Sequence, residues 1–322
     1  GEGKAMHKSL GNGVDPADVF NENGADILRL WAASADYHAD VRCSKEIFKQ
    51  LSQNYLKFRN TCKFMLDNLV DFDPENLVKP EEMPKLDRWL LTKLNELIEK
   101  AEQSYCDYEF HIITHAVNDF CVTTLSSFYL DIVKDRLYCD GADSLSRRSA
   151  QTALYLTLHT LAKLFAPILA FTCDEIWLAM PHTGEDDARN VVLNDMNKPF
   201  TAYALDAETM ARWEHIIEVR TAVNGALEEA RAAKVIGKSL EADVHLTVPE
   251  GDVFLADENP AALADLFIVS KVELTVGGEL AVKVENAAGT KCPRCWKHSL
   301  TPNAEGLCPR CAEVVRHLPD LL

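Results

Sequence analysis

Apolar residues recur at helical spacing through much of the first part of the chain, and this pattern predicts helices. Between residues 46 and 69 they lie alternately three and four positions apart, on one face of a helix: Phe48, Leu51, Tyr55, Phe58, Cys62, Met65 and Leu69. Further helices are expected over 87–101, 110–137 and 146–180. Pro167 should kink or split the last of these, because proline removes a backbone donor and clashes with the preceding turn. Together the helices predict an antiparallel bundle.

Single residues predict where several of these helices begin or change. Asp15 followed by Pro16 is typical of an N-cap and the first helical position. Gly24 should separate that short helix from a second one. Asp87 is expected to cap the helix that follows a proline-rich stretch, and a kink is expected near residues 123–127 of the next helix.

Beyond Gly237 the apolar period changes from that of a helix to that of a strand. Apolar and polar residues alternate over 242–248, as in a half-buried strand, and again over 272–276 and 280–284. Gly277-Gly278, between the last two segments, predicts a hairpin turn. The chain therefore contains several short strands near its end.

Two helices accompany these strands and complete a small α+β domain. A short helix is expected over 260–267, and a long amphipathic one over 207–233. The apolar face of the long helix is expected to hold Met210, Trp213, Ile217, Leu227 and Ala230. The polar segment 183–203 should connect this domain to the bundle. The fold class is thus mainly α, with a helical bundle, a small α+β domain and a cysteine-rich end.

Composition and charge narrow the class of protein. The hydrophobic content of 47% and charged content of 26% fit a soluble globular protein, and no apolar run approaches the ~18 residues of a membrane helix. The net charge of −17 argues against a nonspecific DNA binder, although it allows an RNA enzyme with local basic patches. The chain opens on Gly-Glu-Gly-Lys instead of Met and has no export leader, so we expect a fragment of a longer cytoplasmic protein.

Four of the ten cysteines form two matched pairs, Cys292-Pro-Arg-Cys295 and Cys308-Pro-Arg-Cys311, with twelve residues between them. Two such knuckles can offer four thiolates to one tetrahedral Zn²⁺, which leaves no position for water and makes the zinc structural. An iron–sulfur cluster, a redox dithiol and chance are the alternatives. The other six cysteines lie in apolar helical stretches, as expected for small buried residues of a reduced, cytosolic protein.

The residues around these cysteines suggest further roles. Four thiolates and Zn²⁺ carry a net charge of −2, which Arg294, Lys297 and Arg310 lie close enough in sequence to offset. Trp296, beside these cations, either stacks on a nucleic-acid base or packs over the metal site, and the sequence leaves both open.

Residues 4–12 read Lys-Ala-Met-His-Lys-Ser-Leu-Gly-Asn, a glycine-flanked loop with lysines that suits polyphosphate binding or is simply a solvated basic loop. It resembles the Lys-Met-Ser-Lys-Ser signature loop of class I aminoacyl-tRNA synthetases. Met6, Lys8 and Ser9 match that signature, whereas Ala5 and His7 depart from it and put the role of the first lysine in doubt.

The resemblance to bacterial isoleucyl-tRNA synthetases extends along nearly the whole chain. It is carried by the segments 10–12, 15–16, 24–31, 36–42, 127–138, 166–169 and 174–177. Bacterial isoleucyl enzymes carry a four-cysteine module at this place, whereas valyl enzymes typically end in a coiled coil. A valyl-type relative, or a non-enzymatic zinc-ribbon module that binds nucleic acid, remains the alternative.

The resemblance implies that the longer protein activates isoleucine with ATP and Mg²⁺ and transfers it to tRNA(Ile). We expect this fragment alone to be inactive, because the catalytic and editing domains would lie upstream of it. Lys8 is then the catalytic cation that stabilises the departing pyrophosphate, and Lys8 and Ser9 bind ATP within the loop Ala5–Ser9. We expect a monomer without membrane contact. Four domains are implied: the end of the catalytic domain (1–42), the anticodon-binding bundle (43–182), a helix with the α+β domain (183–290) and the zinc module (291–322).

Some other residues are weaker candidates. Six cations are candidates for contact with the RNA backbone, although for each one taken alone a solvated charge is the favoured interpretation: Arg59, Lys63, Arg88, Arg136, Arg147 and Arg148. His111 and His115 have the spacing of a zinc hydrolase motif, but Ile112 stands where that motif has its catalytic Glu, so catalysis is not expected there.

Overall fold

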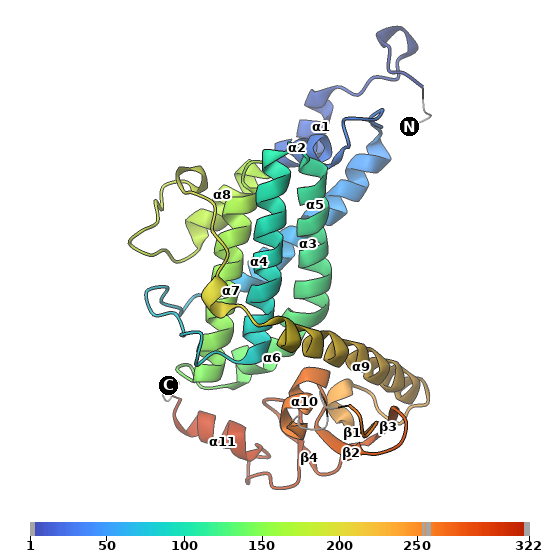
Figure 1. Cartoon of the computed structure of the whole chain (residues 1–322), viewed down its shortest axis with the longest axis vertical. Helices are drawn as coiled ribbons and strands as arrows, with labels where there is room; N and C mark the ends of the chain where they lie inside the picture. Colours follow the sequence, from blue (N-terminus) through green and yellow to red (C-terminus); the bar gives the residue numbers. More distant parts are fainter. Residues whose placement is uncertain (1–3, 253–254, 256–258, 319–322) are drawn as a thin grey trace. The chain divides into compact units, whose positions relative to one another are not determined.

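The computed structural model describes residues 4–252, 255 and 259–318, apart from the side chain of Lys8. The chain forms two compact units (Figure 1). The first contains Gly1–Asp131 and Arg148–Ala204, and the second contains Ile132–Arg147 and Leu205–Leu322. Among the described residues, no helix combines the length and apolar character that a membrane crossing requires.

The first unit is helical, and its long helices run side by side (Figure 1). Its elements are η1 (Lys8–Leu10), α1 (Pro16–Asn23), α2 (Ala25–Ser34), α3 (Lys45–Asp67), α4 (Lys85–Cys106), α5 (Phe110–Asp119), η2 (Phe120–Tyr129), the start of α6 (Leu130–Cys139), most of α7 (Leu145–Phe165), α8 (Ala170–Ala179), η3 (Val191–Leu193) and η4 (Thr201–Tyr203). Helix α7 is buried on nearly all sides from Ser149 to Phe165 and forms the centre of the bundle. The predicted helical bundle is confirmed.

The helix boundaries agree with most of the single-residue predictions. The Asp15 carboxylate accepts a hydrogen bond from the Ala17 N–H and caps α1, whose first residue is Pro16. Gly24, with φ of 86°, separates α1 from α2. Helix α7 ends at Phe165 and α8 begins at Ala170, so the chain breaks around Pro167 as expected.

The prediction that Asp87 caps α4 is wrong. The helix begins earlier, at Lys85, with Pro84 as the N-cap residue. Asp87 lies in the first helical turn and is fully buried, where its carboxylate accepts a 2.7 Å hydrogen bond from the Tyr129 hydroxyl. The helix N-terminus favours a carboxylate at this position too. An acidic residue thus correctly indicated the start of a helix, but its carboxylate accepts a hydrogen bond from the Tyr129 side chain of η2.

The long helix expected over 110–137 departs from α geometry where a kink was predicted. The segment η2, Phe120–Tyr129, is a π-helix that joins α5 to α6. Within it the Ser127 hydroxyl donates a 2.7 Å hydrogen bond to the Val122 carbonyl, five residues earlier. A π segment adds residues to the turn and so changes which side chains face the core.

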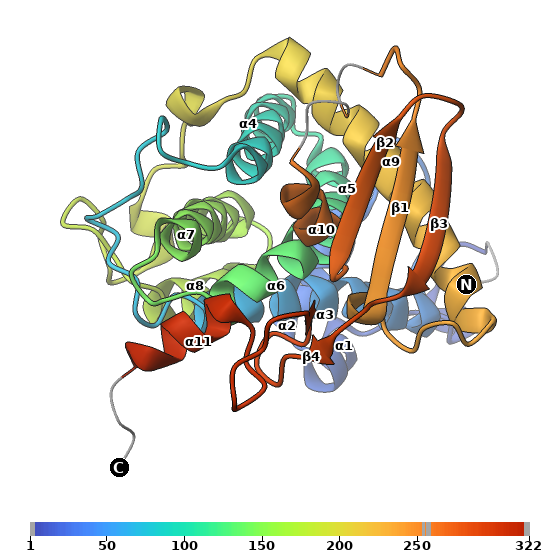
Figure 2. The same ribbon diagram turned by 90° about the horizontal axis from the view of Figure 1, so that it is seen from below.

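The second unit contains the end of α6, the long helix α9 (Ala207–Ala232) and a three-stranded sheet with the order β2-β1-β3 (Figure 2). The strands are β1 (Ala242–Val248), β2 (Lys271–Val276) and β3 (Ala281–Asn286), and the shorter elements are η5 (Ser239–Glu241) and α10 (Pro260–Phe267). Strand β1 pairs in parallel with β2 and antiparallel with β3. All three strands and the helix 260–267 were predicted.

The predicted hairpin between β2 and β3 is wrong, because β1 lies between these strands. Alternate residues of β1 are fully buried, so this strand takes the centre of the sheet and leaves the less buried β2 and β3 as edges. The connection from β2 to β3 passes the end of β1, where the Gly277 N–H donates a 2.8 Å hydrogen bond to the Val248 carbonyl. Gly277 and Gly278 have φ of 126° and 94°, so the glycines serve a crossing instead of a two-residue turn.

Helix α9 buries a face that was predicted only in part. Met210, Leu227 and Ala230 are buried as expected, whereas Trp213 and Ile217 are half-buried. The prediction missed the buried residues Ile216, Val219, Arg220 and Val223. Arg220 was hard to foresee because it is charged; its Nε donates a 3.0 Å hydrogen bond to the Leu266 carbonyl at the end of α10. A satisfied guanidinium thus completes a mostly apolar face.

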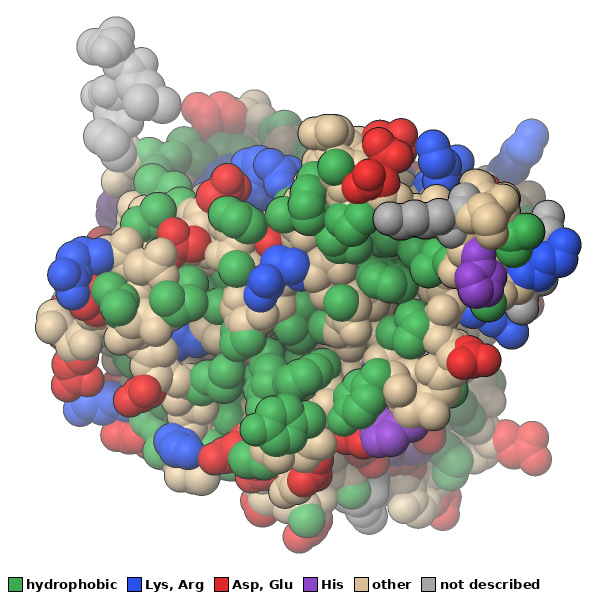
Figure 3. All heavy atoms as spheres, turned by 90° about the horizontal axis from the view of Figure 1, so that it is seen from above, with side chains coloured by type: hydrophobic (Ala, Val, Ile, Leu, Met, Phe, Trp, Pro, Cys, Tyr) green, Lys and Arg blue, Asp and Glu red, His purple; other side chains and the backbone are tan. Residues whose placement is uncertain are grey.

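The end of the first unit at which α1 and α2 lie exposes apolar surface. Seen from that end, hydrophobic side chains gather across the middle of the face, with charged residues around them (Figure 3). Exposed hydrophobic residues of this part of the chain include Phe20, Tyr37 and Val41. Contiguous exposed apolar surface is typical of an interaction surface.

Candidate metal centre

A short two-stranded sheet and a helix bring the two cysteine pairs together. Strand β4 (Thr290–Lys291) pairs antiparallel with β5 (His298–Ser299), and the first pair of cysteines lies in the turn between them. The turn is closed by hydrogen bonds from the Cys292 N–H to the Lys297 carbonyl and from the Trp296 N–H to the Cys292 carbonyl, both 2.9 Å. Gly289 permits this pairing, since a Cβ there would lie 2.4 Å from the Ser299 carbonyl oxygen.

The second pair lies at the start of helix α11 (Pro309–Arg316). Cys308 is the N-cap residue, Pro309 occupies the first turn, and Cys311 follows within that turn. Proline is favoured at this position because its missing N–H has no helical partner to lose. The repeated Cys-Pro-Arg-Cys sequence therefore has two different backbone settings, a strand turn and a helix start.

The four sulfurs converge on one point. The Sγ atoms of Cys292, Cys295, Cys308 and Cys311 all lie within 4.8 Å of one another, and those of Cys295 and Cys308 are 3.7 Å apart. A tetrahedral site with Zn–S bonds of about 2.3 Å requires sulfurs about 3.8 Å apart. In the described part of the chain, no other group of three or more His, Cys, Asp or Glu side chains is arranged to hold a metal ion. The predicted ligands are thus brought together as a metal site needs.

The environment of the thiols bears on how they bind a cation. Burial disfavours the thiolate of Cys292, but hydrogen bonds from the N–H groups of Cys295, Cys308 and Arg294 outweigh it and lower the pKa of Cys292 to about 6. Burial and the neighbouring thiols raise the pKa of Cys295 and of Cys311. One thiolate therefore forms easily, while the others are expected to lose their protons as a cation binds.

The three cations expected to offset the charge of the site have different partners. Arg294 does contact the cluster, with Nη1 3.7 Å from the Cys311 sulfur. Arg310 instead makes a two-pronged ion pair with Asp135 of α6, with Nη–Oδ distances of 2.5 and 2.8 Å. Lys297 pairs with Asp265 of α10. Only the first of these contacts was expected.

A fifth cysteine, which the sequence did not link to the site, packs against the cluster. Cys139, the last residue of α6, shares a buried cluster with Leu307 and three of the four cysteines, Cys292, Cys295 and Cys311. Arg294 donates hydrogen bonds to the carbonyls of Tyr138 and Cys139, and the Cys139 thiol lies 3.8 Å from the Arg294 carbonyl. Cys139 is buried as predicted, but nothing in the sequence indicates a contact with residues 155 positions away.

Trp296 is more than half exposed, with 53% of its surface accessible, and has φ of 66°. The Lys238 ammonium lies 5.3 Å from the centre of its ring. A ring this exposed, with a cation against it, has a free surface on which a base can stack. The geometry favours that interpretation over packing across the metal site.

The signature loop is an exposed segment of the first unit. Residues Lys8–Leu10 form a single 3₁₀ turn, and Ala5, Met6, His7 and Ser9 are exposed. The side chain of Lys8 lies outside what the structure describes. The loop backbone therefore presents Ser9 to solvent, while the roles of Lys8 and Ser9 toward ATP stay predictions.

Two protein families match separate parts of the chain. Residues 1–44 match the family described as tRNA synthetases class I (I, L, M and V), and residues 87–246 match the anticodon-binding domain of tRNA ligase. The isoleucine–tRNA ligase of Moorella thermoacetica is 46% identical over 342 aligned residues, which cover 98% of this chain and 36% of that protein. The isoleucine–tRNA ligase of Syntrophotalea carbinolica is 47% identical over 98% of this chain and 35% of its own length.

This chain is a homologue of the isoleucine–tRNA ligases. It spans 36% and 35% of the length of these two ligases. Their similarity runs through the bundle as well as the cysteine-rich end, unlike that of an isolated zinc-ribbon module. In a crystal structure of an Agrobacterium radiobacter LeuRS–tRNA–LeuAMS complex, the synthetase covers 88% of this chain with a TM-score of 0.49 and 14% identity, a likeness too weak to support a conclusion.

Most of the cations considered for RNA contact in such a ligase domain have structural partners instead. Arg88 donates to the carbonyls of Tyr203 and Ala204, and Arg148 to that of Asp71. In the second unit, Arg136 donates to the Ser146 carbonyl and Arg147 to that of Leu137. These guanidiniums hold loops and helix ends in place.

Arg59 and Lys63 differ from those four residues because both are exposed on α3. Lys63 pairs with Asp67 one turn away, at 2.7 Å. Four exposed cations of α3 recur at helical spacing on one face, together with the exposed Leu56: Lys45, Lys49, Arg59 and Lys63. Such a row of cations in an acidic chain is typical of a surface that meets nucleic-acid phosphates.

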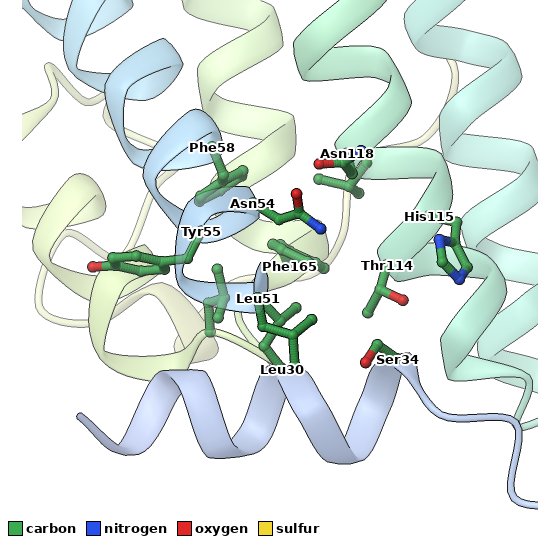
Figure 4. A pocket seen from close by; sticks show the side chains of 12 residues that line it. Leu30, Ser34, Leu51, Asn54, Tyr55, Phe58, Thr114, His115, Asn118 and Phe165 are labelled. Carbon is green, nitrogen blue, oxygen red and sulfur yellow. The ribbon is translucent and has the colours of Figure 1, made fainter. Parts of the chain in front are cut away.

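A small pocket contains the second histidine of the candidate hydrolase motif. It lies between α2, α3, α5 and α7, and its lining includes Leu30, Phe58, His115 and Asn118 (Figure 4). Its volume of about 50 Å³ leaves room for a few water molecules and is too small for a nucleotide. His111 lies 3.3 Å from the Glu109 carboxylate.

Proposed function

We propose that this chain is the C-terminal, tRNA-binding part of an isoleucine–tRNA ligase, which activates isoleucine with ATP and transfers it to tRNA(Ile). The observation that carries this proposal is the 46–47% identity to isoleucine–tRNA ligases over 98% of the chain. The catalytic and editing domains precede this part, and the chain alone has no ligase activity. Editing is needed because one methylene limits discrimination between isoleucine and valine to about 10–200-fold.

In the activation step, isoleucine attacks the α-phosphate of ATP, and negative charge develops on the departing pyrophosphate. Lys8 stabilises that charge, while Lys8 and Ser9 hold the ATP phosphates and Mg²⁺ accompanies the nucleotide. Support for this role comes from the position of the loop within residues 1–44, the segment that resembles class I tRNA synthetases.

The tRNA is held by the bundle and the second unit. The row Lys45, Lys49, Arg59 and Lys63 on α3 meets phosphates, which position the RNA without reading its sequence. Trp296, with Lys238 against its ring, offers a platform for an unstacked base. The row on α3 thus supplies affinity for the RNA backbone, and Trp296 recognises an unstacked base.

The metal is one structural Zn²⁺ held by Cys292, Cys295, Cys308 and Cys311. Four thiolates suit zinc, which has no redox chemistry of its own, and leave no open position for a reacting water. The zinc supplies folding energy to about thirty residues that are too few to build a core. The described part of this segment contains only a handful of buried side chains, most of them cysteines.

The division into a catalytic end (1–42), an anticodon-binding bundle (43–182), an intermediate α+β domain (183–290) and a zinc module (291–322) follows from this assignment. The catalytic domain covers the apolar face seen in Figure 3, which has no other need to be exposed. The ligase works as a monomer in the cytoplasm.

The decisive test is pyrophosphate exchange by the complete ligase that contains this chain. Exchange that depends on isoleucine, with charging of tRNA(Ile), supports the proposal. Valine-dependent charging of a valine tRNA would make the protein a valyl-type relative instead. In parallel, the chain itself should bind tRNA(Ile) more tightly than duplex DNA of equal charge, and the reverse preference would contradict a tRNA-binding role.

A further inference from the structure

The signature loop is closed by a side chain that lies outside the signature itself. Asn12 reaches back across the loop with both ends of its amide: Oδ1 accepts a 2.9 Å hydrogen bond from the His7 N–H, and Nδ2 donates a 3.1 Å hydrogen bond to the Ala5 carbonyl. The two bonds join residues five and seven positions away in the sequence. They turn the segment from Ala5 to Asn12 into a closed ring.

The backbone between these contacts is shaped to bring Asn12 back. The Leu10 N–H donates a 3.0 Å hydrogen bond to the His7 carbonyl, which forms the 3₁₀ turn Lys8–Leu10. Gly11 follows with φ of 62°, a left-handed conformation that reverses the chain and costs a residue with a Cβ roughly 1 kcal/mol. His7 is therefore held on both sides, through its N–H by Asn12 and through its carbonyl by Leu10.

We infer that Asn12 is a positioning residue for amino-acid activation, because it fixes the backbone on which Lys8 and Ser9 stand. This inference rests on the proposed role of the loop toward ATP. A cation stabilises a developing charge only if it is already held where that charge appears, and small displacements cost much of the effect. An exposed loop without this ring would sample many backbone conformations and would lose that entropy each time ATP is bound.

The amide is suited to this task because it offers one donor and one acceptor. The His7 N–H needs an acceptor and the Ala5 carbonyl needs a donor. A carboxylate has no donor, and a hydroxyl has its donor and acceptor on one atom, so neither can bond both groups at the separation of the two amide atoms. Asn12 therefore differs from a surface asparagine whose amide is bonded only to water, because both ends of its amide bond backbone groups across the loop.

The test compares variants of the complete ligase in isoleucine-dependent pyrophosphate exchange. Asn12→Ala should lower kcat for exchange roughly tenfold, as expected for the loss of two hydrogen bonds that hold the loop for the transition state. Transfer of isoleucine from preformed adenylate to tRNA should stay within twofold of the unchanged enzyme, because the pyrophosphate has already left. Hydrogen exchange at the His7 amide should accelerate, since this N–H loses its acceptor.

Two glycines supply a matched pair of variants. Gly11→Ala strains the left-handed turn that returns Asn12 and should lower exchange in the same way. Gly13→Ala should leave exchange unchanged, because Gly13 has no positive φ and a Cβ there meets no atom within 4 Å. Asn76→Ala removes another exposed loop amide, which bonds Asp73, and controls for the loss of an asparagine as such.

Three results would overturn the inference in different ways. If Lys8→Ala abolishes exchange but Asn12→Ala stays within twofold of normal, Asn12 does not position the loop, and the proposed function stands. If Asn12→Ala lowers exchange and transfer equally together with the unfolding temperature, its role is general stability. If Lys8→Ala also retains normal exchange, the proposed role of the loop fails and the inference fails with it.

Discussion

At the level of single residues, Lys8 carries the most specific chemical prediction. Lys8→Ala in the complete ligase should lower adenylate formation a hundredfold or more, roughly the cost of losing one preorganised donor to transition-state charge. The measurement is isoleucine-dependent pyrophosphate exchange. Ala5→Lys, which restores the common signature, should be tolerated. Near-normal exchange by Lys8→Ala would remove this residue from the mechanism.

A second residue, His159, links the stability of the first unit to pH. Its Nε2 lies 2.9 Å from an Asp186 oxygen, and its Nδ1 lies 2.9 Å from the Asn197 amide nitrogen. Burial lowers the pKa of His159 below its ordinary value; the hydrogen bond to Asp186 acts against this, whereas the charge of Lys163 and a nearby His182 add to it. The ring is thus held neutral, donating to Asp186 and accepting from Asn197.

Because the unfolded chain takes up this proton more readily than the folded one, the free energy of unfolding should fall as the pH drops below about 6.5. The loss continues down to the lowered pKa of the folded state and then levels off. Chemical denaturation between pH 7.5 and 5, compared with His159→Gln, measures the effect. The variant keeps a donor and an acceptor but cannot titrate, so its profile should be flatter, and identical slopes would show that other groups dominate.

At the level of elements, α3 should bind tRNA through its row of cations. Affinity should fall steeply with salt, because each phosphate contact releases counterions. Arg59→Glu or Lys49→Glu should weaken tRNA binding. The slope of log affinity against log salt concentration should become smaller by about one, the change expected for one lost phosphate contact. Lys57→Glu is the matched control, since Lys57 is exposed on the same helix but lies off the row. Equal loss for all three variants would indicate a general charge effect instead of a defined surface.

The elements also show what a single sequence can and cannot predict. Helices were placed well because their signals are local: a stripe of apolar residues for α3, and Asp15 with Pro16 for α1. Strand pairing was not, because the register of β2 and β3 depends on β1, some 25 residues or more earlier in the chain. The glycines between β2 and β3 were expected to form a two-residue hairpin turn, but they lie in a connection that passes the end of β1, so the two strands do not pair. Asp87 failed for a related reason, since its hydrogen-bond partner, Tyr129, is distant in sequence.

The candidate site divides in the same way. The four cysteine ligands were predicted because their spacing alone implies a shared metal, and the structure brings them together. Cys139 and Asp135 were not linked to the site, because their contacts with Arg294 and Arg310 join residues 155 and 175 positions apart. Arg294 contacts the cluster as its position in the sequence suggested, whereas the direct ion-pair partners of Arg310 and Lys297 are carboxylates of α6 and α10. The charge of Arg310 still acts on Cys295.

At the level of the whole molecule, these contacts change what loss of zinc should do. From sequence alone, removing zinc should unfold residues from about Lys291 onward and spare the bundle. The second unit, however, includes the corner Ile132–Arg147, and Cys139 at the end of α6 packs against the cysteine cluster. Arg310 holds Asp135 and, despite the burial that opposes it, keeps the pKa of that carboxyl below its usual range. The end of α6 should therefore loosen together with the zinc module.

Hydrogen exchange of the complete ligase, before and after chelation, measures how far the loosening spreads. Protection should be lost over 291–318 and 132–147 but kept in α3, α4 and most of α7, which belong to the first unit. Cys308→Ser should do the same, with less than about one equivalent of zinc bound. tRNA charging should fall more than adenylate formation, because the module serves the RNA.

Arginine variants separate the metal from the contact it supports. Arg310→Ala should keep the zinc yet raise exchange over 132–147, because it removes the two-pronged pair with Asp135. Arg316→Ala is the control: its pair with Glu313 is exposed and lies within α11, so little should change. If chelation leaves 132–147 protected from exchange while 291–318 unfolds, the zinc module folds independently, and the metal does not stabilise segment 132–147.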